Sequence, residues 1–240
     1  KDSIVWERIS WDLGGNNNSN LNTLDQSPLD SNLVYTSEGS RKFFRTNNAL
    51  APMDEVVWED LSNVLPWVSV PVTACEPHPF DTSIVYLGFD KRVWKSENQG
   101  DDWVDISGTL PSVNINSIVF DNNSEEGLYI STDMGVYFKD AGMDDWISFS
   151  TGFPLGVRAT ELEIYYGETV ADSRIRCSTY GRGLWESDLF DAETYLFPAI
   201  ASLNTDLGTE EVFGSFDAEI SFYRNLQNVE VTAFEAADLE

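Results

Sequence analysis

The sequence predicts an all-β protein built from β-propeller blades, and two observations indicate this fold. The first is a phrase of Trp, two residues, an apolar residue and Ser, with a further apolar residue three positions on. It begins at Trp58, Trp103 and Trp146, with a fainter copy at Trp6, so it recurs at intervals of roughly 43 to 52 residues. The second is that no stretch of about a dozen residues shows an apolar period of 3.6, which predicts very little helix. Four short strands per repeat of this length are typical of a propeller blade.

Within each repeat, three short runs rich in Val, Ile, Tyr, Phe and Trp precede the Trp phrase, and turn-forming residues bound each run. The first run is expected to form one strand, the second and third a hairpin, and the Trp phrase the fourth strand. First runs are expected at 70–75, 115–120 and 162–166. Second runs are expected at 32–36, 84–89, 127–132 and 175–179, and third runs at 43–45, 93–95, 136–138 and 184–186.

The phase of the repeat leaves two interpretations of the ring open. The chain opens with a fourth-strand phrase, whereas its last repeat reaches Trp185 without one. Residues 1–10 could complete the last blade and close a four-bladed ring. Alternatively they belong to a preceding blade, and the chain is an excerpt of a ring of about six to eight blades. A start at Lys1, with neither an initiator methionine nor a signal peptide, suggests an excised or processed piece.

Composition narrows the class of protein. With 14 basic and 41 acidic residues the formal net charge is −27, which argues against nucleic acid as a partner and suits a soluble protein outside the cytosol. No apolar run of about 18 residues is present, so no membrane span is expected. Cys75 and Cys177 are too few for a disulfide framework, and we expect two buried thiols on blades that are not neighbours.

One turn resembles a known repeat. The segment Ser96-Glu-Asn98-Gln-Gly100-Asp-Asp-Trp103 resembles the Asp-box of BNR-repeat propellers, which include sortilin-, sialidase- and xyloglucanase-like proteins. In such a turn the Asn side chain caps backbone N–H groups, Gly supplies a positive φ and Trp packs between sheets. The resemblance implies a structural role for these residues, at the edge of the ring and away from its ligand face.

A second resemblance suggests the domain organisation. The end of the last repeat, Ser178 to Trp185, resembles the phrase that closes propellers in large secreted proteins of gliding, type IX-secreting bacteria. Residues 189–240 contain no Trp and one basic residue, Arg224. The alternation of apolar residues over 216–222 is typical of a half-buried strand and resembles the start of a bacterial Ig-like repeat. We therefore expect a propeller over 1–188 and a linker with the start of an Ig-like β-sandwich over 189–240.

A candidate ligand face follows from the blade pattern. The turns between second and third strands lie on the same face as the turns leading into first strands, and basic residues gather in them although the chain is strongly acidic. They would suit an anionic group of a glycan, such as a uronate or sulfate. The alternative is that turns tolerate charge and the grouping has no function. The candidate face consists of Arg41, Lys42, Asp90, Lys91, Arg92, Asp133, Tyr180 and Arg182.

Catalytic and metal signals are sparse, and we assign no catalytic residue. A glycosidase needs two carboxyl groups about 5 Å or about 6.5–9.5 Å apart, and Asp90 and Asp133 are the best-placed acids. His78 lies in a polar turn and is expected to be solvated. No cofactor is expected, and 14–20 and 121–126 offer oxygen donors for Ca²⁺ without matching an EF-hand.

Together these features favour a non-enzymatic extracellular propeller of a large cell-surface or secreted protein, serving adhesion or carbohydrate binding. One alternative is a fragment of a propeller glycoside hydrolase, and another is a scaffold that binds protein. Fold alone does not decide among them. The expected partner is a glycan or a surface protein.

Overall fold

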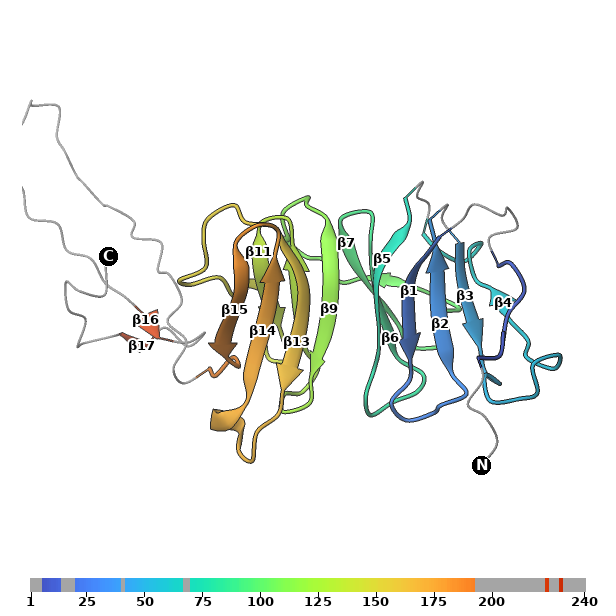
Figure 1. Ribbon diagram of the computed structural model, residues 1–240. Coiled ribbons are helices and arrows are strands. Elements are labelled where there is room, and N and C mark those ends of the chain that lie inside the picture. Colours follow the sequence, from blue (N-terminus) through green and yellow to red (C-terminus); the bar gives the residue numbers. More distant parts are fainter. Residues whose placement is uncertain are drawn as a thin grey trace, which may run out of the picture. The chain divides into compact units, whose positions relative to one another are not determined.

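Each repeat folds into one antiparallel sheet in the computed structural model (Figure 1). The structure describes residues 6–13, 20–39, 42–66 and 70–192, and the backbone of two further short strands. Blade 1 contains β1 (Leu21–Gln26), β2 (Val34–Glu38), β3 (Lys42–Thr46) and β4 (Glu59–Asp60). Blade 2 contains β5 (Val72–Pro77), β6 (Val85–Phe89), β7 (Arg92–Ser96) and β8 (Val104–Asp105). Blade 3 contains β9 (Ile115–Asp121), β10 (Gly127–Thr132), β11 (Gly135–Lys139) and β12 (Ile147–Ser148). Blade 4 contains β13 (Ala159–Tyr165), β14 (Arg174–Thr179) and β15 (Gly183–Asp188).

The strand order confirms the predicted blade. Within each sheet every strand pairs with its neighbour in the chain, from the first strand outward. β2, β6 and β10 are buried along their whole length, because these middle strands have sheet neighbours on both edges and packed residues over both faces. In blade 1 one face packs on blade 2 and the other on Leu13, Val56 and Trp58. The described residues contain no α-helix, and the one helical turn is a 3-10 helix (η1, Val170–Asp172). No helix in this part of the chain is long and apolar enough to cross a membrane.

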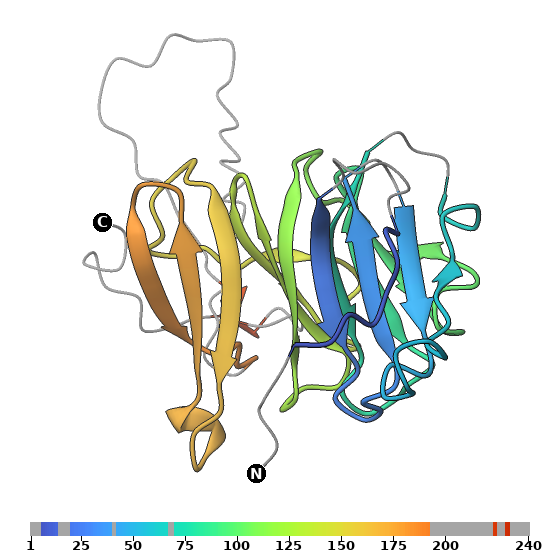
Figure 2. The ribbon, with the colours of Figure 1, turned by 45° about the vertical axis from the view of Figure 1, so that its right-hand side comes forward.

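Apolar layers between successive blades hold the sheets together. The first strands contact one another in the order β1, β5, β9, β13, and Figure 1 shows β5 and β9 between β1 and β13. Figure 2 shows the same sheets turned, with blades 1 and 4 at opposite sides of β9. Between blades 1 and 2, Phe43 stacks on Tyr35 at 5.7 Å and packs with Val72 and Leu87. A similar layer between blades 2 and 3 contains Tyr86 and Ile130. Each blade therefore buries a face that it cannot bury alone, which is the physical basis of a repeat fold.

The Trp phrases occupy equivalent places, as predicted. Trp58 and Trp146 are buried and Trp103 is half-buried, and each directly precedes a two-residue outer strand. Trp146 Nε1 donates to Ile106 O of the preceding phrase at 2.7 Å. Trp58 Nε1 makes the same bond to Ile9 O at 2.9 Å. Residues 6–13 thus pack on blade 1 at the place of a preceding blade's outer strand, and they do not complete the three-stranded blade 4.

The turn between β7 and β8 has the hydrogen bonds expected from its sequence. Asp102 N donates to Asn98 Oδ1 at 2.8 Å, and Gly100 N donates to Ser96 Oγ at 2.8 Å. Gly100 has φ of 100°, in the region that favours glycine. The ring of Trp103 contacts Phe43 edge-on at 6.1 Å, so this turn packs against blade 1.

The chain divides into two units, Lys1–Asp188 and Leu189–Glu240. In the second unit the structure describes only the paired strands β16 (Tyr223–Arg224) and β17 (Val229–Glu230). The strand expected over 216–222 lies outside the described residues, and the Ig-like module remains an expectation. In the first unit both cysteines are buried and free, as predicted, on the non-neighbouring blades 2 and 4.

Candidate functional site

A β-bulge recurs near the start of every first strand. In β1 the pairing with β2 passes from Leu21 to Thr23, and β5, β9 and β13 skip one residue at the equivalent place. A bulged residue leaves the ladder, and its side chain is aimed differently from that of a paired residue. The four bulged residues, one from each blade, are Asn22, Thr73, Asn116 and Thr160.

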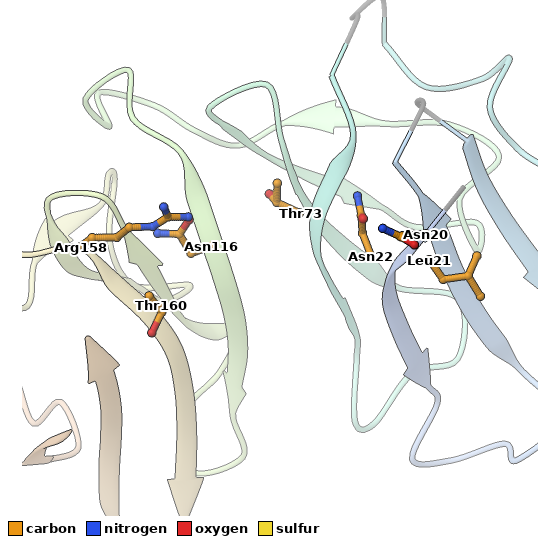
Figure 3. Close-up of a pocket in the computed structure, with 7 residues that line it drawn as sticks. All are labelled: Asn20, Leu21, Asn22, Thr73, Asn116, Arg158 and Thr160. Carbon is orange, nitrogen blue, oxygen red and sulfur yellow. The ribbon is translucent and has the colours of Figure 1, made fainter. Parts of the chain in front are cut away.

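These bulged residues surround one pocket on the face where the first strands begin (Figure 3). The pocket has a volume of about 790 Å³, within the range of about 300–1,000 Å³ usual for ligand sites. Figure 3 shows Arg158 reaching toward Asn116 from one side, with Thr73 and Asn22 opposite. The lining residues are Asn20, Leu21, Asn22, Thr73, Asn116, Arg158 and Thr160. A lining of neutral amides and hydroxyls with one guanidinium offers many hydrogen bonds and little apolar surface.

An ion pair tied to two amides supports the side of the pocket formed by Arg158 and Asn116. Arg158 Nε lies 3.1 Å from Asp133 Oδ1, and an Arg158 terminal nitrogen donates to Asn116 Oδ1 at 3.3 Å. Asn114 Nδ2 donates to Asp133 Oδ2 at 2.7 Å, and Asn116 Nδ2 donates to Asp133 Oδ1 at 3.2 Å. Both Asp133 oxygens therefore accept hydrogen bonds, and the carboxylate holds the Nε edge of the guanidinium.

The bulged threonines are held by strand carbonyls. Thr73 Oγ1 lies 2.8 Å from Gly88 O of its own blade and 2.6 Å from Ile115 O of blade 3. Gly88 permits this approach, because a Cβ there would lie 2.7 Å from Ile115 Cγ2. In blade 4, Thr160 Oγ1 donates to Ser178 O at 3.1 Å. The sheets thus set the positions of these hydroxyl groups.

An acidic groove runs along the first strands beneath the pocket. Three residues beyond the bulge, blades 1, 2 and 4 carry Asp25, Glu76 and Glu163, while blade 3 carries Val119. These residues and Glu161 line a cavity of about 490 Å³. Burial, reinforced by the negative charge of Glu161, raises the pKa of Asp25 to about 7. Burial raises the pKa of Glu76 to about 8, although Phe120 N donates to its carboxylate at 3.2 Å. Near neutral pH these two groups therefore hold protons to a much larger extent than ordinary carboxyl groups, Glu76 more than Asp25.

Most residues of the sequence-predicted ligand face lie outside the pocket lining, and the convergence of its basic side chains stays a prediction. Asp133 alone among those that the structure describes joins the pocket network. Arg92 pairs with Asp105 of the outer strand β8, and Lys42 lies 5.9 Å from the Phe44 ring. Asp90 and Lys91 form the turn between β6 and β7. Tyr180 is exposed, Arg182 O accepts from Trp185 Nε1 at 3.0 Å, and Arg41 lies outside the described residues.

His78 is buried, contrary to the expectation of a solvated turn residue. Its Nδ1 accepts from Phe80 N at 3.0 Å, and its Nε2 lies 3.5 Å from a Glu126 carboxylate oxygen. The ring packs on Phe120 of blade 3 at 4.4 Å, so this residue joins two blades. Burial lowers the pKa of His78. No group of three or more His, Cys, Asp or Glu in the described part of the chain is arranged to hold a metal ion.

Comparison with known proteins supports the fold. No protein-family model and no curated protein matches the sequence. Among solved structures, an ancestral GH74 enzyme matches with a TM-score of 0.51 and 14% identity, over 91% of this chain and 36% of that one. A GH74 enzyme of Niastella koreensis matches with a TM-score of 0.50 and 11% identity, over 88% of this chain and 29% of that one. YCF48 from Cyanidioschyzon merolae matches with a TM-score of 0.48 and 14% identity, over 76% of this chain and 56% of that one.

At these identities the comparisons show the β-propeller fold. The chain spans about a third of the length of the two GH74 enzymes.

The bulged residues and Arg158 were not predicted from the sequence. A signal was present, since each first strand carries Asn or Thr directly after the apolar residue that opens it.

Proposed function

We propose that this chain forms part of a carbohydrate-active propeller of the glycoside hydrolase type, and that its pocket binds a polysaccharide. The observation that carries this proposal is the set of four bulged residues, Asn22, Thr73, Asn116 and Thr160. Through them each of the four blades places one amide or hydroxyl group around a single pocket. Sugar hydroxyl groups both donate and accept hydrogen bonds, and amides and hydroxyls match both functions.

The structural neighbours favour the hydrolase type over the non-enzymatic adhesin. Two solved structures that share the fold are GH74 enzymes, which are glycoside hydrolases. Secretion, suggested by the acidic composition and by the resemblance to propellers of gliding bacteria, agrees with a polysaccharide ligand outside the cell. The protein-binding scaffold remains the third candidate, with no specific contact in its favour.

Binding is tested by a pair of double variants of the full-length protein on an array of neutral and acidic glycans. Asn22→Ala with Arg158→Ala is expected to weaken binding by at least about tenfold, because both side chains line the pocket. Arg92→Ala with Arg182→Ala is the matched control, since it removes two cations from the same face outside the pocket. Loss of binding in the control alone would contradict the pocket as the binding site. It would indicate that the glycan binds at the basic turns instead.

Cleavage is the second candidate function, and the acidic groove specifically favours it. Glycoside hydrolysis pairs a protonated carboxyl group with an ionised one. Asp25 and Glu76 have raised pKa values, while Glu161 and Glu163 are exposed beside them. Asp25 or Glu76 could serve as the acid, with an exposed glutamate as the second carboxylate.

The test of cleavage is reducing-end release from any glycan that binds. Of Asp25→Asn and Glu76→Gln, the variant that replaces the acid is expected to lower the rate of release by at least about 100-fold, because an amide cannot supply the proton. Binding of the same glycan should persist in both variants. Full release in both variants would exclude the groove as the catalytic centre, and binding without release in the wild type would favour the adhesin.

A further inference from the structure

The positive charge that Arg158 brings to the candidate site is offset by the neighbouring carboxylate of Asp133. Arg158 is the one basic residue among the described residues that line the pocket. Its side chain is 54% exposed, whereas that of Asp133 is 32% exposed. The guanidinium can therefore reach a ligand, but its Nε edge already faces a carboxylate at 3.1 Å. A carboxylate ligand would have to compete with Asp133 for that edge.

Asp133 is itself held in place, so it cannot easily yield to a ligand. The two amide donors Asn114 and Asn116 engage its two oxygens. Asn116 Nδ2 is anchored in turn on Ala159 O at 2.7 Å, next to Arg158 in the chain. Deeper along the first strands, the groove adds the carboxyl groups of Glu161 and Glu163 and no basic residue among its described lining. The negative electrostatic potential of these groups opposes the approach of an anion along the first strands.

We propose that Asp133 is a specificity-determining residue that makes the pocket reject anionic glycans by occupying Arg158. This inference rests on the proposed carbohydrate-binding function and narrows the substrate class to uncharged or cationic sugars. It also replaces the anionic ligand expected from the basic turns. Arg158 then acts as a donor to sugar hydroxyl groups, and Asp133 and Asn116 keep its guanidinium in position.

The test is a gain of binding. Tetragalacturonate binding to the full-length protein is measured by calorimetry at low ionic strength, for the wild type and for Asp133→Asn. The amide is nearly isosteric but carries no charge, so it frees Arg158 for a carboxylate of the probe. Affinity for tetragalacturonate is expected to rise by at least about tenfold, and to fall again as salt is added.

Two further variants make the result specific. Asp133→Glu keeps the charge and should show no gain, whereas Asp133→Asn with Arg158→Gln should lose the gain. A gain that persists in the Arg158→Gln double variant, or no gain in a folded Asp133→Asn protein, would overturn the proposal. Melting temperatures identify any unfolded variant, and Asp133→Ser provides the same charge removal if Asp133→Asn does not fold.

These outcomes are separable from the fate of the proposed function. If neutral glycans bind the wild type and Asp133→Asn shows no higher affinity for tetragalacturonate, the pocket is supported as a glycan site. The proposed role of Asp133 in rejecting anions is then wrong. If Asp133→Asn gains tetragalacturonate binding while no glycan on the array binds the wild type, the charge selection stands and the carbohydrate function fails.

Discussion

Replacing Trp146 with alanine is expected to lower the free energy of unfolding by about 3–5 kcal/mol, the usual cost of truncating a large buried aromatic side chain. Trp146 is 7% exposed and belongs to the layer between blades 2 and 3. The substitution also leaves Ile106 O without its indole donor, which adds an unsatisfied acceptor at a partly buried site. Urea unfolding followed by circular dichroism measures the change.

Trp6, which opens another copy of the same phrase, supplies a matched control. Its side chain is fully exposed in the described chain, so Trp6→Ala should change the free energy of unfolding by less than about 0.5 kcal/mol. Equal losses for the two variants would contradict the placement of residues 6–13.

The free energy of unfolding is expected to fall as pH rises from about 5 to about 9, and Glu76 is expected to cause much of the fall. In the folded protein its pKa is about 8 against an ordinary value of 4.5. A group with a raised folded pKa binds its proton more tightly in the folded state, so its contribution is complete below the unfolded pKa and is lost as pH rises through the folded pKa. One pKa unit corresponds to about 1.4 kcal/mol.

Glu76→Gln should remove this dependence without removing the hydrogen bond from Phe120 N, because the amide retains a carbonyl oxygen. At pH 9 we expect the variant to be more stable than the wild type by roughly 2–4 kcal/mol, with little difference at pH 5. Chemical unfolding at the two pH values measures both quantities.

The exposed Glu163, at the equivalent place in blade 4, is the control. Glu163→Gln should change stability by less than about 1 kcal/mol at either pH. Parallel pH profiles for wild type and Glu76→Gln would show that the groove does not hold Glu76 protonated.

The sequence predicted strands wherever burial made them apolar. The strand expected at 127–132 has the same limits as β10, since Gly127 to Thr132 form one continuous run packed on both faces. The sequence did not predict β1, in which the side chains of Leu21 and Leu24 are 53% and 73% exposed. Nothing in that segment has a local strand signal. Its strand conformation comes from the ladder with β2, which is a non-local interaction.

His78 and the candidate site show the same limit. The turn sequence around His78 is polar, yet Phe120, from the next blade, covers the ring. The basic turns were recognised, but the direction of Arg92 depends on Asp105 across the sheet. Asp133 was a candidate from its turn, whereas its partner Arg158 precedes the next blade's first strand and became a neighbour only on folding.

The sequence by itself determined the fold class, the four-strand blade, the hydrogen-bonded turn at Asn98 and the two free cysteines. These depend on local turn chemistry and on a periodic apolar pattern, which are properties of short segments. Only the tertiary structure decided where polar groups converge. A bulge is a mismatch in register between two strands, and the pocket requires one such mismatch from each of four blades. No single segment contains that information, because the pairing and the packing of separate blades create it.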